Sequence, residues 1–304
     1  MLTYSKLLER IKYFLFEVEN DWEIGITSTS VESIFFTGKL PEIKWLKMPR
    51  NVFWADPFGM EQNNHYCIFY EEFQKDKGYA TINCMTLDSG LKELQRKVIL
   101  DKGSHLSYPY IFSYAGHYYM LPESCVAGKL MLFKATSFPF EWKEESILLH
   151  IPCVDSILFH AKDYWWLLYS KGMTDNCNSV LYVRKNSNPI TGWGNCSELA
   201  IHSTAYNTRN GGVVFASDSE LYRITQNCTE RYGQSVVINK ITTLSDHNFA
   251  ETPAKEILLK QRGVTGFHTL SPLGKYALVD RRRERLFFKS PLKMIHSIRR
   301  KAVQ

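Results

Sequence analysis

Short runs of apolar and aromatic residues follow one another along most of the chain, separated by clusters of Gly, Asn, Asp, Ser and Pro. This pattern starts at Trp22 and is typical of many short strands rather than of alternating helices. Before it, Leu8, Ile11, Leu15 and Val18 recur at helical spacing, so residues 5–18 are predicted to form an amphipathic helix. The chain is therefore predicted to be all-β, with one short helix at its N-terminus.

Five segments of the chain repeat one form, in which a short strand, a tight polar turn and an aromatic second strand follow one another. They begin about fifty residues apart and cover residues 54–72, 106–124, 153–170, 207–226 and 266–282. Between them there is room for two further strands, and four strands per repeat of this length are the blade of a β-propeller. We therefore expect a five-bladed β-propeller, with a strand from Trp22–Phe36 closing the ring. A β-sandwich is the alternative, although it leaves the repeated hairpin unexplained.

The 304 residues, 44% of them hydrophobic, are enough for a large core. We expect three parts: an N-terminal helix over residues 1–20, the propeller over residues 21–285 and a basic tail over residues 286–304. Basic residues are concentrated at the end, because residues 281–304 contain nine Lys or Arg and one acid. This distribution predicts contact of residues 281–304 with an anionic membrane rather than nucleic-acid binding, although a solvated tail is an equal alternative.

The sequence shows neither the pattern of a signal peptide nor an apolar stretch long enough to span a membrane. The seven cysteines do not have the spacing of a metal-binding motif. The expected location is therefore the cytoplasm, with the possibility of attachment to the inner face of the membrane. No Walker loop, GxGxxG, HExxH, EF-hand or GxSxG motif is present either. We accordingly expect neither a metal ion nor a cofactor.

Two sets of equivalent positions are predicted to meet at one mouth of the central channel, because the first strands of all blades run in the same direction. The first set, near the start of each first strand, is Asp56, Tyr108, Asp155, Arg209 and His268. The second set, at the end of each second strand, is Glu71, Glu123, Ser170, Gln226 and Arg281. Because a cluster this polar is costly to bury unless it is paired or used, we predict a site for a polar ligand.

Several of these residues also allow a purely structural interpretation. Asp56 precedes Pro57 and is equally suited to a strand end, and His268 is equally suited to a hydrogen-bonded place in the core. Glu123 is alternatively an ion-pair partner of Arg209 or Arg223. Trp54 is the tryptophan expected to stack on a sugar ring, and Arg209 with Gly211-Gly212 suggests a close approach to a phosphate or carboxylate.

Several motifs of the chain resemble known families. FWADPF (53–58) is similar to the first blade of carbohydrate-active five-bladed propellers such as arabinanases, β-xylosidases, levansucrases and invertases. Together with HLSYPYIF (105–112), YYMLPES (118–124), VDSILF (154–159), LYRITQNC (221–228) and GFHTL (266–270), it more closely resembles the N-terminal domain of plant glucosamine inositolphosphorylceramide transferase and its bacterial stand-alone relatives. The plant proteins carry a separate transferase domain. In the comparison with the glycosidases, neither Glu123 nor Asp155 stands at a position equivalent to one of their other two catalytic acids.

The resemblance and the paired carboxylates together predict a carbohydrate-active propeller that transfers a glycosyl group in surface polysaccharide or glycolipid assembly. Asp56 is the expected base or nucleophile, Glu123 the acid/base partner and Asp155 the group that orients and tunes them. The residues expected to bind the sugar or sugar phosphate are Trp54, Glu71, His105, Tyr108, Arg209, Arg223, Gln226, His268 and Arg281. A glycoside hydrolase of the same fold and a glycan-binding or partner-binding propeller without catalysis are the alternatives.

Overall fold

The computed structural model describes residues 12, 14–172 and 177–289, and most of its secondary structure is β-strand. Twelve strands form three antiparallel four-stranded sheets. The first unit is β3 (Val52–Gln62), β4 (His65–Gln74), β5 (Tyr79–Leu87) and β6 (Glu93–Leu100). The second unit is β7 (Ser107–Tyr114), β8 (His117–Glu123), β9 (Leu130–Ser137) and β10 (Glu141–Leu149). The third unit is β11 (Cys153–Ala161), β12 (Tyr164–Lys171), β13 (Val180–Asn186) and β14 (Glu198–His202).

The remaining strands form two further four-stranded units, which a single parallel pairing between Gly212 and Leu270 joins into one sheet. The fourth unit is β15 (Asn210–Ser217), β16 (Glu220–Asn227), β17 (Ser235–Leu244) and β18 (Phe249–Ile257). The fifth unit is β20 (Leu270–Leu273), β21 (Tyr276–Phe288), β1 (Phe16–Thr27) and β2 (Ile43–Trp45), and β19 (Val264–Gly266) also pairs with β21. Two short 3₁₀ helices, Cys125–Ala127 and Trp193–Asn195, lie in connections.

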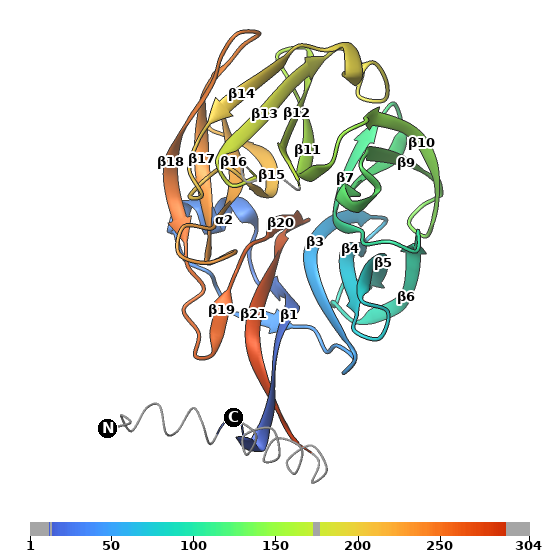
Figure 1. Ribbon diagram of the computed structural model, residues 1–304, viewed down its shortest axis with the longest axis vertical. Coiled ribbons are helices and arrows are strands. Elements are labelled where there is room, and N and C mark those ends of the chain that lie inside the picture. Colours follow the sequence, from blue (N-terminus) through green and yellow to red (C-terminus); the bar gives the residue numbers. More distant parts are fainter. Residues whose placement is uncertain (1–11, 13, 173–176, 290–304) are drawn as a thin grey trace, which may run out of the picture.

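The units are arranged around a common centre, as Figure 1 shows. The first strands of neighbouring units contact one another in turn, from β3 to β7, β11, β15 and β20 and back to β3. Such a closed ring of twisted sheets is how propellers leave only short edges exposed. The mostly-β architecture predicted from the repeat is confirmed.

The fifth unit combines the two ends of the chain, because β1 pairs with β21 over its whole length, from Phe16–Phe288 to Ile26–Leu278. The expectation that a strand near Trp22 closes the ring is therefore confirmed up to Thr27. It is wrong for residues 31–37, which form the helix α2 (Val31–Thr37). Ser30 accepts a hydrogen bond from Ser33 N at its start, and Gly38 ends it with a φ of 68°.

The predicted N-terminal helix over residues 5–18 lies for the most part outside the described residues, and from Phe16 onward the chain is strand. The pair of β1 and β21 also extends beyond residues 21 and 285, the expected limits of the propeller. In the part of the chain that the structure describes, no helix has the length and apolar character needed to cross a membrane.

Candidate active site

Three of the five predicted inner-strand positions have an unusual backbone conformation. Asp56, Tyr108 and Asp155 have positive φ angles of 50°, 46° and 47°. Each lies where the pairing of its strand with the next one shifts register, as in a β-bulge. Left-handed backbone at a residue other than glycine costs on the order of 1 kcal/mol or more and is concentrated at functional sites. The repeat found in the sequence thus marks equivalent bulges in three units.

At two of these bulges the freed main-chain N–H donates to a carboxylate of a neighbouring unit. Asp56 N donates to Asp280 Oδ2 at 3.3 Å. Asp155 N donates to Glu123 Oε2 at 3.1 Å. The bulges therefore position two acidic side chains that come from other strands.

The acidic side chains meet in one cavity of about 220 Å³ at the centre of the ring. Seven residues predicted from the sequence line it, namely Asp56, Glu71, His105, Glu123, Asp155, Arg209 and His268. Trp22, Phe53, Ala55, Ser107 and Tyr232 complete its wall. The three predicted catalytic acids thus share one cavity, although they are far apart in the sequence.

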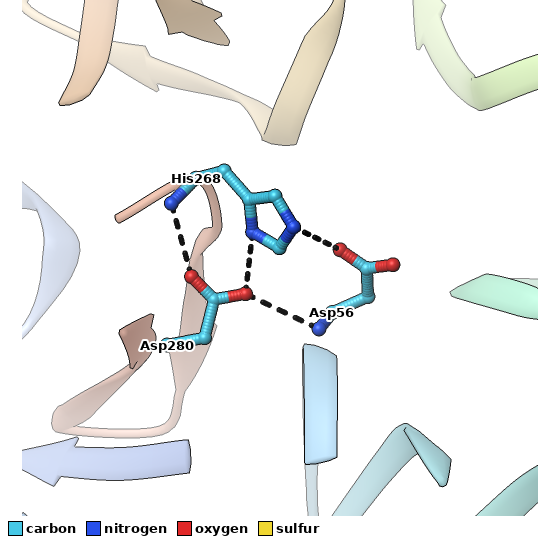
Figure 2. A group of neighbouring side chains, drawn as sticks. All are labelled: Asp56, His268 and Asp280. Carbon is cyan, nitrogen blue, oxygen red and sulfur yellow. Dashed lines mark hydrogen bonds and ion pairs between the residues drawn. The ribbon is translucent and has the colours of Figure 1, made fainter. Parts of the chain in front are cut away.

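Asp280, His268 and Asp56 form a chain of polar contacts at the wall of the cavity (Figure 2). His268 Nδ1 lies 2.6 Å from Asp280 Oδ2, and its Nε2 lies 3.7 Å from Asp56 Oδ1. Thr269 Oγ1 donates to Asp56 Oδ1 at 3.0 Å. Burial by itself would lower the pKa of His268, but the carboxylates of Asp280 and Asp56 overcome this effect and raise it. The two carboxylates therefore favour the charged form of the imidazole.

By position alone, Asp56, His268 and Asp280 could also hold a metal ion, because one ligand atom of each lies within 4.8 Å of the others. The donor set does not fit this role. Asp280 Oδ1 accepts from the main-chain N–H groups of His268 and Thr269, while Oδ2 accepts from His268 Nδ1 and Asp56 N. Four donors occupy the lone pairs that a metal would need. Asp280 instead holds His268 and the backbone of Asp56 in place.

Three carboxyl groups of the cavity, those of Asp56, Glu71 and Glu123, are shifted toward their protonated forms. Burial raises the pKa of Asp56 to about 6, with His268 opposing the shift and Asp280 adding to it. Burial and then Asp155 raise the pKa of Glu123 to about 8. Burial, Asp56 and Glu123 together raise the pKa of Glu71 well above its usual value. At neutral pH the cavity therefore combines an ionised Asp56 with a protonated Glu123.

Asp155 has a different environment, in which its carboxylate is paired. Its Oδ2 accepts from Arg209 Nε at 2.5 Å and from Gln226 Nε2 at 3.1 Å. Burial opposes the charge of Arg209, but Asp155 raises the pKa of the guanidinium overall. Because Asn210 Nδ2 also donates to the main-chain oxygen of Asp155 at 2.7 Å, the fourth unit fixes both ends of this residue. Gln226 therefore supports Asp155 and does not line the cavity.

His105 lies next to Glu71 and has a defined tautomer. Its Nδ1 accepts a hydrogen bond from Ala80 N at 3.3 Å, so the ring proton is on Nε2. This Nε2 lies 3.7 Å from Glu71 Oε1. Burial lowers the pKa of His105, which keeps the ring neutral. His105 thus offers a neutral N–H to the cavity.

Three aromatic residues of the cavity wall, Trp22, Phe53 and Tyr232, were not among the residues predicted from the sequence. Trp22 is stacked on His268, with 3.8 Å between the ring centroids and 11° between the planes. Tyr232 meets His268 edge-on at 5.3 Å and lies under the guanidinium of Arg209. Trp22 comes from the closing strand and Tyr232 from a connection, so the alignment of the five hairpins contained neither.

Trp54 and Tyr108, two predicted ligand contacts, lie outside the cavity. Trp54 is completely buried, and its Nε1 donates to Glu72 Oε2 at 2.9 Å, so it belongs to the core of the first unit. Tyr108 is also completely buried, and its hydroxyl donates to Gly212 O and accepts from Gly212 N. The side chain of Tyr108 is therefore directed at the backbone of β15 and does not line the cavity.

The predicted arginines Arg223 and Arg281 have structural partners. Arg223 is fully buried and pairs with Glu251. Arg281 pairs with Glu23 at 2.8 Å and lies over the ring of Trp45. Successive residues of a strand point to opposite faces, so the residue that reaches the site from β21 is the preceding Asp280. An alignment that is off by one residue therefore selected Arg281.

The glycines after Arg209 also serve packing. A Cβ at Gly211 would lie 2.7 Å from His268 O, and one at Gly212 would lie 2.0 Å from Leu270 O. They therefore allow β15 to approach the fifth unit. The predicted close approach is to protein backbone rather than to a ligand.

Residues 41–266 match the family described as glucosamine inositolphosphorylceramide transferase 1, N-terminal. The chain belongs to this family. It is 35% identical over 213 residues to glucosamine inositolphosphorylceramide transferase 1 of Arabidopsis thaliana, and 33% identical over 210 residues to that of Oryza sativa subsp. indica. These matches cover 67% and 66% of this chain but only 27% and 28% of the relatives. The family segment contains Asp56, Glu123 and Asp155, whereas Trp22, His268 and Asp280 lie outside it.

Solved structures of propeller glycosidases share the fold. The catalytic domain of a GH62 α-L-arabinofuranosidase from Coprinopsis cinerea superposes with a TM-score of 0.57 at 10% identity, covering 88% of this chain and 98% of that one. An α-L-arabinanase from Cellvibrio cellulosa, in complex with arabinohexaose, gives 0.52 at 13% identity, covering 66% of this chain and 77% of that one. At these identities the likeness concerns the fold alone.

Proposed function

We propose that this member of the family is a carbohydrate-active, five-bladed propeller that acts on a glycosyl group in its central cavity. The observation that carries the proposal is that Asp56 and Glu123 line one cavity, in which burial raises the pKa of Asp56 to about 6 and that of Glu123 to about 8. One is ionised and the other protonated at neutral pH, which is the combination that glycosyl chemistry requires.

In the proposed reaction, Glu123 gives its proton to the oxygen that leaves the anomeric carbon as the glycosidic bond breaks. Asp56 either accepts a proton from the incoming hydroxyl or bonds to the anomeric carbon itself. Asp155 orients Glu123 through its N–H. Arg209, which also pairs with Asp155, offers its guanidinium to a phosphate or an anionic substituent. Trp22 and Tyr232 offer ring faces for the apolar side of a sugar.

The names of the relatives support a glycolipid as acceptor or donor and an amino sugar as the glycosyl group, since they are called glucosamine inositolphosphorylceramide transferases. The chain spans little more than a quarter of their length, so a partner domain that completes the reaction is part of the proposal. Transfer during glycolipid or surface polysaccharide assembly is preferred over hydrolysis of a free glycan.

The test is a panel of nitrophenyl glycosides of glucosamine, arabinofuranose and xylose, together with nucleoside-diphosphate sugars. We expect one of them to be turned over, and Asp56→Asn to lower this turnover about 100-fold to 10,000-fold without loss of folding. Asp76→Asn, in an exposed turn, is the matched control. Saturable sugar binding without turnover of any probe, or equal turnover by Asp56→Asn, would instead identify a glycan-binding module.

A further inference from the structure

The paired strands β1 and β21 extend beyond the body of the molecule as a two-stranded ribbon (Figure 1). The extension runs from Asp21–Arg283 to the last pair, Phe16–Phe288. Both ends of the described chain leave from its tip, where Lys289 N donates to Leu15 O at 2.9 Å. A surface at this tip is therefore continuous with both termini of the protein.

The ribbon has two chemically different faces, because residues directly opposite each other in an antiparallel pair point to the same side. One face consists of Phe16, Val18, Leu286 and Phe288 toward the tip and of Asn20 and Glu284 closer to the body. The other face carries charges and consists of Glu17, Glu19, Asp21, Arg283, Arg285 and Phe287. The ribbon is thus amphipathic along its outer half.

Cross-strand contacts neutralise the charged face. Arg285 pairs with Asp21 at 3.2 Å, and Lys75 of the first unit pairs with Asp21 at 2.7 Å and with Glu19. Arg283 pairs with Glu23 at 2.7 Å, as does Arg281 at 2.8 Å. The basic residues at 281, 283 and 285 therefore stabilise the fifth unit, and a membrane contact has to rely on residues farther along the chain.

The apolar face is exposed on the β21 side, whereas Phe16 and Val18 on β1 are half-buried. Phe288 is 78% exposed and Leu286 is 46% exposed. The ring of Phe288 lies 4.4 Å from that of Phe16, so the two form one aromatic surface. Large apolar side chains grouped at a projecting tip are typical of an interaction surface.

The charge of the adjoining sequence indicates the partner. Residues 289–304 contain five Lys or Arg and no acid. Basic residues next to exposed aromatic and aliphatic side chains suit a membrane with anionic headgroups, because the charges are attracted to the headgroups and the apolar side chains are buried among the lipids. We propose that the tip of the β1–β21 ribbon docks on an anionic membrane surface, with Leu286 and Phe288 entering the headgroup region. This contact does not depend on the proposed catalysis, because the ribbon lies outside the cavity.

The test is sedimentation of the full chain with vesicles of phosphatidylcholine, with and without phosphatidylglycerol. We expect binding only to the anionic vesicles, weakened by salt. The double variant Leu286→Ser/Phe288→Ser is expected to bind about tenfold more weakly. The triple variant Arg299→Gln/Arg300→Gln/Lys301→Gln is expected to lose on the order of 100-fold at low salt.

Phe36→Ser is the matched control, because Phe36 is an equally large side chain, 59% exposed, on α2 rather than on the ribbon. It is expected to bind like the unchanged protein. Equal binding by the ribbon variant and this control, or equal binding to neutral vesicles, overturns the proposal. A dimer in light scattering that the ribbon variant abolishes also overturns it, since the tip would then be an interface between copies.

Discussion

Asp155 donates its main-chain N–H to Glu123 Oε2 at 3.1 Å. Asp155 lies near the start of β11 in the third unit, whereas Glu123 is the last residue of β8 in the second unit. The contact depends on the left-handed backbone of Asp155, whose φ is 47°. This N–H stabilises the ionised carboxylate and so lowers the pKa of Glu123. Burial raises it by more, and the pKa is about 8. The bulge therefore tunes an acid that lies in the neighbouring sheet.

The pH dependence of turnover follows from the two shifted carboxyl groups. Activity requires ionised Asp56 and protonated Glu123, so kcat/KM is expected to fall below about pH 6 and above about pH 8. Glu123→Gln is expected to remove the alkaline limb along with most of the activity. Initial rates across this range on a nitrophenyl glycoside that is turned over provide the measurement. A profile that rises steadily through pH 9 would contradict the assignment of Glu123.

Stability is expected to depend on pH in the direction set by Glu123. Its pKa rises from 4.5 to about 8 on folding, so between these values the folded protein holds a proton that the unfolded chain releases. The free energy of unfolding therefore decreases as the pH rises through this window. Glu123→Gln stays neutral and is expected to be more stable than the unchanged protein at pH 9 by at least about 1 kcal/mol. Urea unfolding at pH 5 and pH 9 measures this, with Glu141→Gln, at an exposed position, as the control.

Asp280 is expected to act as a positioning residue through His268. In Asp280→Asn the largest attraction for the imidazolium is lost, so the pKa of His268 should fall. In the unchanged protein, the raised pKa of His268 stabilises the folded state fully below pH 6.5, and this stabilisation is lost as the pH rises through the pKa of His268 in the folded protein. Asp280→Asn lacks this contribution. We expect a loss of about 3 kcal/mol at pH 6. NMR titration of the imidazole and denaturant unfolding test both effects, and an unchanged His268 titration would refute the role.

Trp22 and Trp54 are expected to respond differently to truncation. Trp22→Ala removes a ring from the cavity wall and should weaken sugar binding about tenfold. Trp54→Ala creates a cavity in the core and should cost about 3 to 5 kcal/mol of stability while leaving the affinity of the folded protein unchanged. Calorimetric binding and thermal unfolding of both variants separate these outcomes. The reverse pattern would restore Trp54 as the ligand contact.

The repeat in the sequence could predict the sheets and the first set of site residues, because equivalent bulges recur at Asp56, Tyr108 and Asp155. It could not tell that the side chain of Tyr108 is turned away, since only the hydrogen bonds to Gly212 define that orientation. Asp280 was missed because a slip of one residue along a strand exchanges its two faces. Trp22 was missed because the closing strand lies outside the repeat.

The hydroxyl of Tyr108 reaches from β7 to Gly212 on β15 and both donates to and accepts from its backbone. This contact spans the middle of the molecule between two units that are not neighbours in the ring. The middle of the molecule is therefore filled on this side by a hydrogen-bonded side chain, which acts as a non-covalent crosslink between the second and the fourth units.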